Sequence, residues 1–218
     1  MVEYTYCLFR RKRMYIDLLN NLAIAAAFLF LAGKIYENGK FDFSPSIKIK
    51  IIAGLASGAL GTVLMASTII GPNQVIIDLR HLSILIAAIY SGPVAALIGT
   101  SIIAIMRLII YGISTASLFA AANILFIGLF CALLGTRKIQ AAYKHLFMNL
   151  FSLLMISIFF YLLVPDIQDT KQILAYYWPT SIFAGAFIYA ISEYIKKSIE
   201  NNRLMSYFKA VAENSNDL

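Results

Sequence analysis

Long apolar stretches separated by short polar connections run through most of this chain of 218 residues. There are six of them, at residues 15–36, 49–70, 82–111, 117–136, 146–165 and 174–195. A helix needs about 20 apolar residues to cross the hydrocarbon core of a bilayer, and each stretch reaches that length. Hydrophobic residues make up 61% of the chain, whereas a soluble domain is about 45–50% apolar. We therefore predict an all-α integral membrane protein, a bundle of about six transmembrane helices embedded in the lipid bilayer.

The basic residues cluster where the apolar stretches begin or end. The clusters are Arg10, Arg11, Lys12 and Arg13, then Arg137, Lys138 and Lys144, then Lys196, Lys197 and Arg203. Cytoplasmic loops of membrane proteins carry an excess of Lys and Arg, so this pattern predicts a multi-pass protein with both termini in the cytoplasm. The net charge of +7 is explained by the same clusters, which argues against nucleic acid as a partner.

One connection disagrees with this orientation. Residues 34–50 carry Lys34, Lys40, Lys48 and Lys50 on the side that six crossings make external. Two alternatives stay open: the stretch 82–111 forms a re-entrant hairpin around Gly92-Pro93, or the chain crosses the membrane five times.

The composition changes after Ser192, where the last apolar stretch gives way to a polar sequence. Apolar residues continue at near-helical spacing as far as Val211, which predicts a helix that leaves the membrane and enters the cytoplasm. We therefore divide the chain into a basic cytoplasmic N-terminus at 1–14, a transmembrane domain at 15–195 and a cytoplasmic linker helix at 196–218.

Glycine and proline residues predict where the helices pack or break. Gly54, Gly58 and Gly61 fall on one face of the second helix, and in lipid such a face lets two backbones approach closely. We expect this face to pack within the bundle, with a dimer seam or a ligand-facing groove as alternatives. Gly92-Pro93 interrupts an apolar stretch, which predicts a break or kink whose freed carbonyls could line a ligand site.

Ionisable and amide residues at membrane depth are the candidate ligand-binding residues, because such groups usually face the bundle interior or a wet cavity. Asp78 and Arg80 are two residues apart and would not face each other on a helix, so we expect them to have different partners or to lie on a turn. Arg107 could reach lipid phosphates, pair with Asp78, or hold an anionic ligand such as a carboxylate. Asn20, Asn21 and Asn123 add amide groups that either join helices or bind a ligand.

Signatures of enzyme chemistry are missing from the sequence. It has no glycine-rich phosphate loop, no nucleophile motif and no cluster with the spacing of metal ligands. We therefore predict no catalytic residues, no metal site and no cofactor for this chain.

Taken in order, the residues from Gly54 to Gly112 resemble the LytS-YhcK-type five-transmembrane receptor family, abbreviated 5TMR-LYT. The matching features are the glycines of the second stretch with Met65, then Asp78-Leu79-Arg80, Gly92-Pro93, Arg107 and Gly112. The resemblance extends over about residues 15–195. It implies the sensor domain of a two-component histidine kinase or a diguanylate cyclase in the bacterial cell membrane, which passes a signal to a cytoplasmic output domain.

The resemblance also implies a ligand and an assembly. Relatives in this family are linked to cell-wall regulation and to the sensing of small carboxylates, so we expect a small carboxylate, another small molecule or an envelope state as the stimulus. The end of the chain, 207–218, looks like the start of a PAS domain, and output domains of this kind imply a homodimer. The alternative function is a small-solute transporter or a substrate-binding membrane subunit, which would have no need of the polar exit helix.

Overall fold

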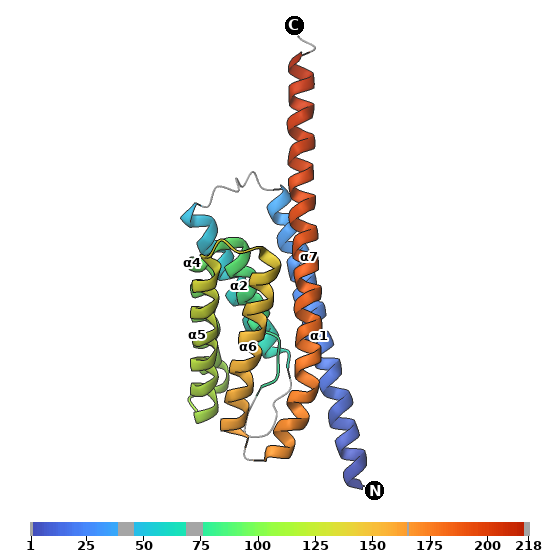
Figure 1. Cartoon of the computed structure of the whole chain (residues 1–218), viewed down its shortest axis with the longest axis vertical. Coiled ribbons are helices and arrows are strands. Elements are labelled where there is room, and N and C mark those ends of the chain that lie inside the picture. Colours follow the sequence, from blue (N-terminus) through green and yellow to red (C-terminus); the bar gives the residue numbers. More distant parts are fainter. Residues whose placement is uncertain (1, 39–45, 69–75, 165, 216–218) are drawn as a thin grey trace.

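The computed structural model describes residues 2–38, 46–68, 76–164 and 166–215. Its helices are α1 (Val2–Asn38), α2 (Ile47–Ala66), α3 (His81–Ile86), the π-helical turn η2 (Ala87–Ser91), α4 (Pro93–Tyr111), α5 (Thr115–Gly135), α6 (Ala141–Leu163) and α7 (Ile167–Ser215). Six of these described helices, α1, α2, α4, α5, α6 and α7, are long and apolar enough to cross a membrane. They form one bundle (Figure 1), which confirms the predicted all-α membrane architecture.

The third apolar stretch, 82–111, contains two separate helical segments. The turn η2 ends at Ser91, Gly92 has a φ of +86°, and Pro93 begins α4. A positive φ favours glycine because it has no Cβ, and proline suits the first position of a helix because its missing N–H would have no intrahelical partner there. Gly92-Pro93 therefore separates two helices, as the predicted break required. Gly112, with a φ of +73°, ends α4 in a similar way.

α2 and α4 run in the same direction and pack along the predicted glycine face. The α4 side chain nearest to Gly54 is Ile98, and the one nearest to Gly58 is Ile102. A Cβ added at either glycine would lie 2.7 Å from the Cβ of its isoleucine, and Gly61 lies against α4 in the same row. The backbones come this close because glycine leaves room for them. The glycine face thus packs within the bundle, which was the expected role.

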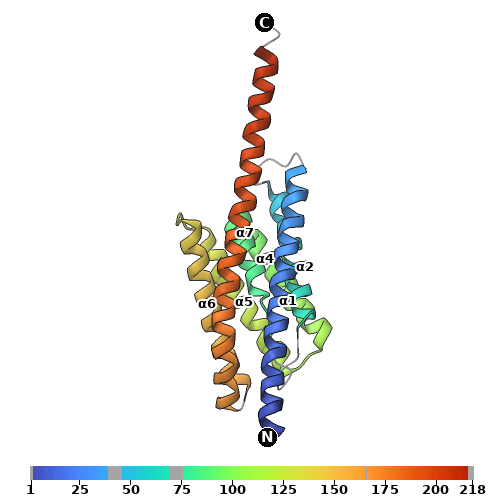
Figure 2. The ribbon, with the colours of Figure 1, turned by 90° about the vertical axis from the view of Figure 1, so that its right-hand side faces the viewer.

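The chain must return through the bundle between α2 and α4, because these two helices are parallel. The return is made by residues 76–80, which are not helical, followed by α3 and η2. We call residues 76–91 the return segment. It adds one passage to the six long helices, so the two ends of the described chain lie at opposite ends of the molecule (Figures 1 and 2).

This arrangement differs from the predicted topology, in which both termini lie on the same side. The prediction treated residues 82–111 as a single crossing, whereas the structure folds them into a helical hairpin. The backbone of residues 10–13 accordingly lies at the end of the bundle opposite to the α5–α6 connection (Figure 1). The re-entrant alternative considered for Gly92-Pro93 describes this part of the chain better.

α7 is one helix of 49 residues that packs beside α1 and then projects beyond the rest of the bundle (Figure 1). Gly33 of α1 lies directly against Ile195 of α7 at the point where the projection starts. The predicted linker helix is therefore continuous with the last long apolar helix. Residues 216–218, the end of the predicted start of an output domain, lie outside the described residues.

The glycine seam between α2 and α4 can be tested with Gly58→Leu. The new side chain would collide with Ile102, and overpacking of this kind costs about 1–3 kcal/mol. We expect a lower midpoint of thermal unfolding in detergent. Ala59→Leu is the matched control, because Ala59 is exposed on the outer face of α2. Equal midpoints of unfolding for the two variants would contradict the close packing of α2 on α4 at Gly58.

Candidate functional site

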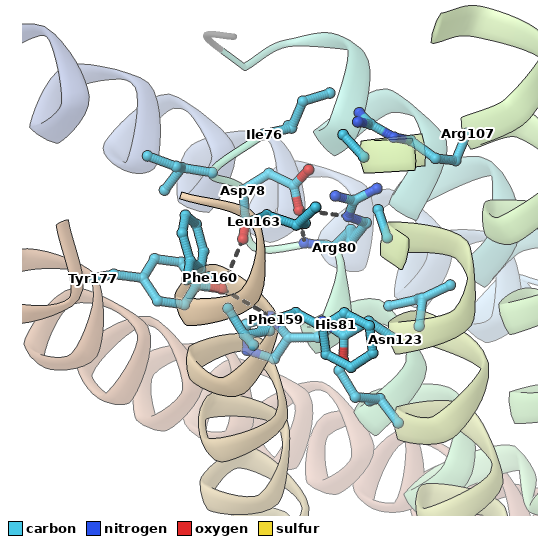
Figure 3. A pocket seen from close by; sticks show the side chains of 16 residues that line it. Ile76, Asp78, Arg80, His81, Arg107, Asn123, Phe159, Phe160, Leu163 and Tyr177 are labelled. Carbon is cyan, nitrogen blue, oxygen red and sulfur yellow. Dashed lines mark hydrogen bonds and ion pairs between the residues drawn. The ribbon is translucent and has the colours of Figure 1, made fainter. Parts of the chain in front are cut away.

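A cavity of about 60 Å³ lies inside the bundle, where the start of the return segment meets α4, α5, α6 and α7. Its polar lining residues are Asp78, Arg80, His81, Arg107, Asn123 and Tyr177. The remaining lining residues are apolar and include Phe159 and Phe160 (Figure 3). Asp78, Arg80, Arg107 and Asn123 had been singled out in the sequence, and the fold brings these four to one place.

Asp78 and Arg80 pair with each other across a turn. Arg80 Nε lies 3.0 Å from Asp78 Oδ1, and the backbone N–H of Arg80 donates a hydrogen bond to the same oxygen, also at 3.0 Å. Of the two expected alternatives, different partners or a turn, the structure shows the turn, because this part of the chain is not helical. Asp78 is 5% exposed, so the ion pair lies inside the protein.

The two arginines of the cavity are positioned by α2 and α4. Arg80 Nη1 donates to the sulfur of Met65 at 2.9 Å, which gives a role to the methionine singled out by the resemblance. The guanidinium carbon of Arg107 lies 4.5 Å from the centre of the Tyr111 ring, at cation–π distance. Arg107 is 1% exposed, so the structure directs this side chain into the bundle and not toward lipid phosphates.

Two oxygen atoms of the cavity lack a hydrogen-bond donor among the described residues. They are Asp78 Oδ2 and Asn123 Oδ1, and both are buried. Buried polar atoms in folded proteins nearly always have a partner, so acceptors of this kind indicate a place for a bound molecule or water.

The backbone of the return segment is held by side chains from other helices. The hydroxyl of Tyr177 on α7 donates to the carbonyl of Asp78 at 2.9 Å, and the N–H of Leu79 donates to Asn21 Oδ1 at 3.3 Å. Asn21 also donates to the hydroxyl of Thr68 at 3.0 Å. An irregular backbone at membrane depth needs such partners, because lipid offers none.

Asn20 does not belong to the site. Its side chain is exposed on the outside of α1, whereas the adjacent Asn21 is fully buried. Adjacent residues on a helix point about 100° apart, so an amide pair in the sequence does not tell which member faces the core. The sequence singled out both asparagines, and the prediction chose Asn20 as the candidate ligand-binding residue, whereas Asn21 is the one that faces the bundle interior.

A second polar cluster lies beside the cavity and connects it to α6 and α7. His81 Nε2 lies 3.3 Å from Asn149 Oδ1 and 3.2 Å from the hydroxyl of Ser181, and Tyr177 Oη lies 3.4 Å from His81 Nδ1. Tyr177 lies in the aromatic run 176–178 and is 1% exposed, so its side chain lies inside the bundle. Asn149 could have been found by the criterion that identified Asn123, an amide within an apolar stretch.

The other end of the return segment also contacts α7. The hydroxyl of Tyr90 in η2 donates to Glu193 Oε1 at 2.8 Å. Glu193 lies on α7 two residues before Ile195, which contacts Gly33 of α1. The return segment therefore contacts α7 beside the cavity and again near the start of the projection.

The electrostatic character of the cavity favours an anion. Its lining has two guanidinium groups, of Arg80 and Arg107, against the one carboxylate of Asp78. Coulomb interactions are several times stronger inside a protein than in water. Among the described lining residues, guanidinium groups therefore outnumber carboxylates.

The family model described as 5TMR of 5TMR-LYT matches residues 40–199, which is most of the chain. The chain belongs to this family. It is a 5TMR-LYT membrane sensor domain, a type found in signalling proteins. No curated protein and no solved structure matches the chain.

The matched range explains the helix count. It contains α2, α4, α5, α6 and the part of α7 up to residue 199, so five of the long described helices fall within the 5TMR-LYT range. α1 precedes this range, which is why the chain has six long helices. The sequence resemblance had been extended to residue 15 and so included α1.

The hydrogen bonds of Asn21 can be tested with Asn21→Ala. This change leaves the buried N–H of Leu79 without its acceptor, which should cost about 1–3 kcal/mol of stability. We expect a lower midpoint of thermal unfolding and, for Asn20→Ala, a midpoint close to that of the unchanged protein. A larger decrease in the midpoint for Asn20→Ala than for Asn21→Ala would contradict the role given to Asn21.

Proposed function

We propose that this sensor domain detects a small anionic ligand, such as a carboxylate, in the cavity between the return segment, α4, α5 and α6. The observation that carries this proposal is the group of Asp78, Arg80 and Arg107 around a cavity, in which Asp78 and Arg107 are buried and one oxygen of Asp78 has no donor among the described residues. Buried charges inside a membrane protein are costly and usually serve function. A planar guanidinium group binds a carboxylate with two hydrogen bonds.

We infer that the bound state is reported to a cytoplasmic output domain of the histidine kinase or diguanylate cyclase type in a bacterial cell membrane. Membership of a sensor family supports this inference, and so does α7, which carries the chain out of the bundle as one continuous helix. A transporter would have no need of this projection. Regulation of the cell wall is one process that such a sensor would serve.

The distribution of basic residues supports a cytoplasmic location for the end from which α7 projects. The start of α2 with Lys48 and Lys50, the α5–α6 connection with Arg137 and Lys138, and the projecting part of α7 lie toward this end (Figure 1). The lysines of the 34–50 connection, which contradicted the predicted topology, agree with this arrangement as far as the described residues reach. Arg10 to Arg13 are the exception, because their backbone lies toward the other end.

The return segment offers a physical route from the cavity to the output. Its first residues line the cavity and contact Tyr177 and Ser181, while Tyr90 at its far end holds Glu193. A ligand that shifts Asp78 or Arg80 would move the return segment, which is hydrogen-bonded to α7 near both of its ends. Small shifts of packed helices are a common form of conformational switching.

The projecting part of α7 supports a homodimer through the output region. Leu204, Phe208 and Val211 follow the i, i+4, i+7 spacing of one helix face and are all exposed. Apolar residues on a helix in water favour pairing with a second apolar face.

The anion site is tested by Arg107→Ala in a protein in which the chain is joined to its output domain. We expect at least a tenfold loss of sensitivity to ligand, because a charged hydrogen bond contributes about 1.5–3 kcal/mol, while membrane insertion is unchanged. Arg137→Ala is the control, since Arg137 is exposed outside the bundle core. A normal response from the Arg107 variant would contradict the proposed site.

The route to the output is tested by Tyr90→Phe, which removes the hydrogen bond to Glu193. We expect ligand binding to persist while the change in output activity on binding falls about tenfold, as the loss of one charged hydrogen bond allows. Tyr194→Phe changes an exposed tyrosine on the same part of α7 and is the control. Equal responses from the two variants would rule out this contact as part of the route.

A further inference from the structure

The donor and acceptor groups of the cavity restrict the kind of anion that fits it. Asp78 Oδ1 already accepts hydrogen bonds from Arg80, but Asp78 Oδ2 has no donor among the described residues, and neither has Asn123 Oδ1. A simple carboxylate offers acceptors alone, so it could satisfy the arginines and would leave both oxygens without a donor. A ligand that completes the site must therefore carry a hydrogen-bond donor as well as a negative charge.

We propose that the ligand is a small hydroxycarboxylate, a monoanion with a hydroxyl group next to its carboxylate. This inference rests on the proposed anion site. The carboxylate faces the guanidinium group of Arg107, and the hydroxyl donates to Asp78 Oδ2. Figure 3 shows Asp78, Arg80 and Arg107 around one space, so both ends of a short molecule can be bound at once.

The charges of the lining residues favour a hydroxycarboxylate over an amino acid as the ligand. Among the described lining residues, two guanidinium groups stand against one carboxylate, which is an excess of one positive charge. A monoanion balances this excess, whereas a zwitterionic amino acid brings no net charge and would place its ammonium group near two arginines. Unbalanced charge in a buried site is costly, so the monoanion is favoured.

The size of the cavity restricts the ligand further. A buried water needs about 10–15 Å³ of cavity volume. A cavity of about 60 Å³ therefore has room for a molecule of the size of glycolate or lactate. Phe159, Phe160 and Leu163 are among the apolar residues that line the cavity. A larger hydroxy acid, such as one with two further carboxylates, exceeds this space.

The experiment compares four ligands on the purified full chain in lipid nanodiscs by isothermal titration calorimetry. Glycolate and lactate carry the hydroxyl, acetate lacks it, and glycine replaces it with an ammonium group. We expect glycolate or lactate to bind at least tenfold more tightly than acetate, since a hydrogen bond to a charged buried acceptor contributes about this factor. Glycine should bind more weakly than acetate.

A variant of Asp78 tests whether this residue produces the preference for a ligand with a hydroxyl group. Asp78→Asn keeps the size of the side chain and removes its negative charge, so the ratio of glycolate to acetate affinity should fall below threefold. Asp166→Asn, which changes an exposed carboxylate, is the control and should keep the ratio. The comparison of ligands on the unchanged chain decides the proposal even if the Asp78 variant does not fold.

Three other outcomes would each contradict the proposed hydroxycarboxylate ligand. Acetate binding as tightly as glycolate would mean that water satisfies Asp78, so the hydroxyl assignment fails while the anion site stands. Glycine binding most tightly would assign a zwitterionic ligand instead. No binding of any carboxylate to the unchanged chain would overturn the anion site itself together with this inference.

Discussion

The close parallel packing of α2 on α4 is the constraint on which the rest of the structure depends. Glycines on α2 bring the two backbones together, and both helices then point the same way through the bundle. Parallel neighbours in sequence order cannot be joined by a short loop, so the chain has to cross back between them. This is why a short helical segment, interrupted at Gly92, lies inside a bundle of longer helices.

The return segment places polar backbone groups inside the bundle, and side chains of other helices form hydrogen bonds with them beside the cavity. Residues 76–80 are not helical; the N–H of Leu79 donates to Asn21 of α1, and the C=O of Asp78 accepts from Tyr177 of α7. The same non-helical stretch lets Asp78 and Arg80 face each other. Because the bundle has already supplied polar partners here, two charged residues can be buried at a depth where they would otherwise be very costly.

The site and the exit helix are linked by the same segment. The cavity lies at the first residues of the return segment, while its last turn, the π-helical η2, holds Glu193 through Tyr90. π-Helical turns often occur at functional positions because they re-aim side chains within a helix. The cavity residues Asp78 and Arg80 therefore belong to a segment that contacts α7 at two levels. The packing that made the return necessary also places hydrogen bonds between this segment and α7.

The sequence by itself determined the membrane bundle, the six long apolar helices and the break at Gly92-Pro93, because hydrophobicity and helix breaking are local properties. It also singled out Asp78, Arg80, Arg107 and Asn123, which the fold brings to one cavity. The tertiary structure decided the direction of the chain, the choice of Asn21 over Asn20, and the burial of Tyr177 beside the cavity. These features depend on which helices pack together and in which direction. Helix periodicity states that one face is buried, but it does not identify the neighbouring helix that covers it.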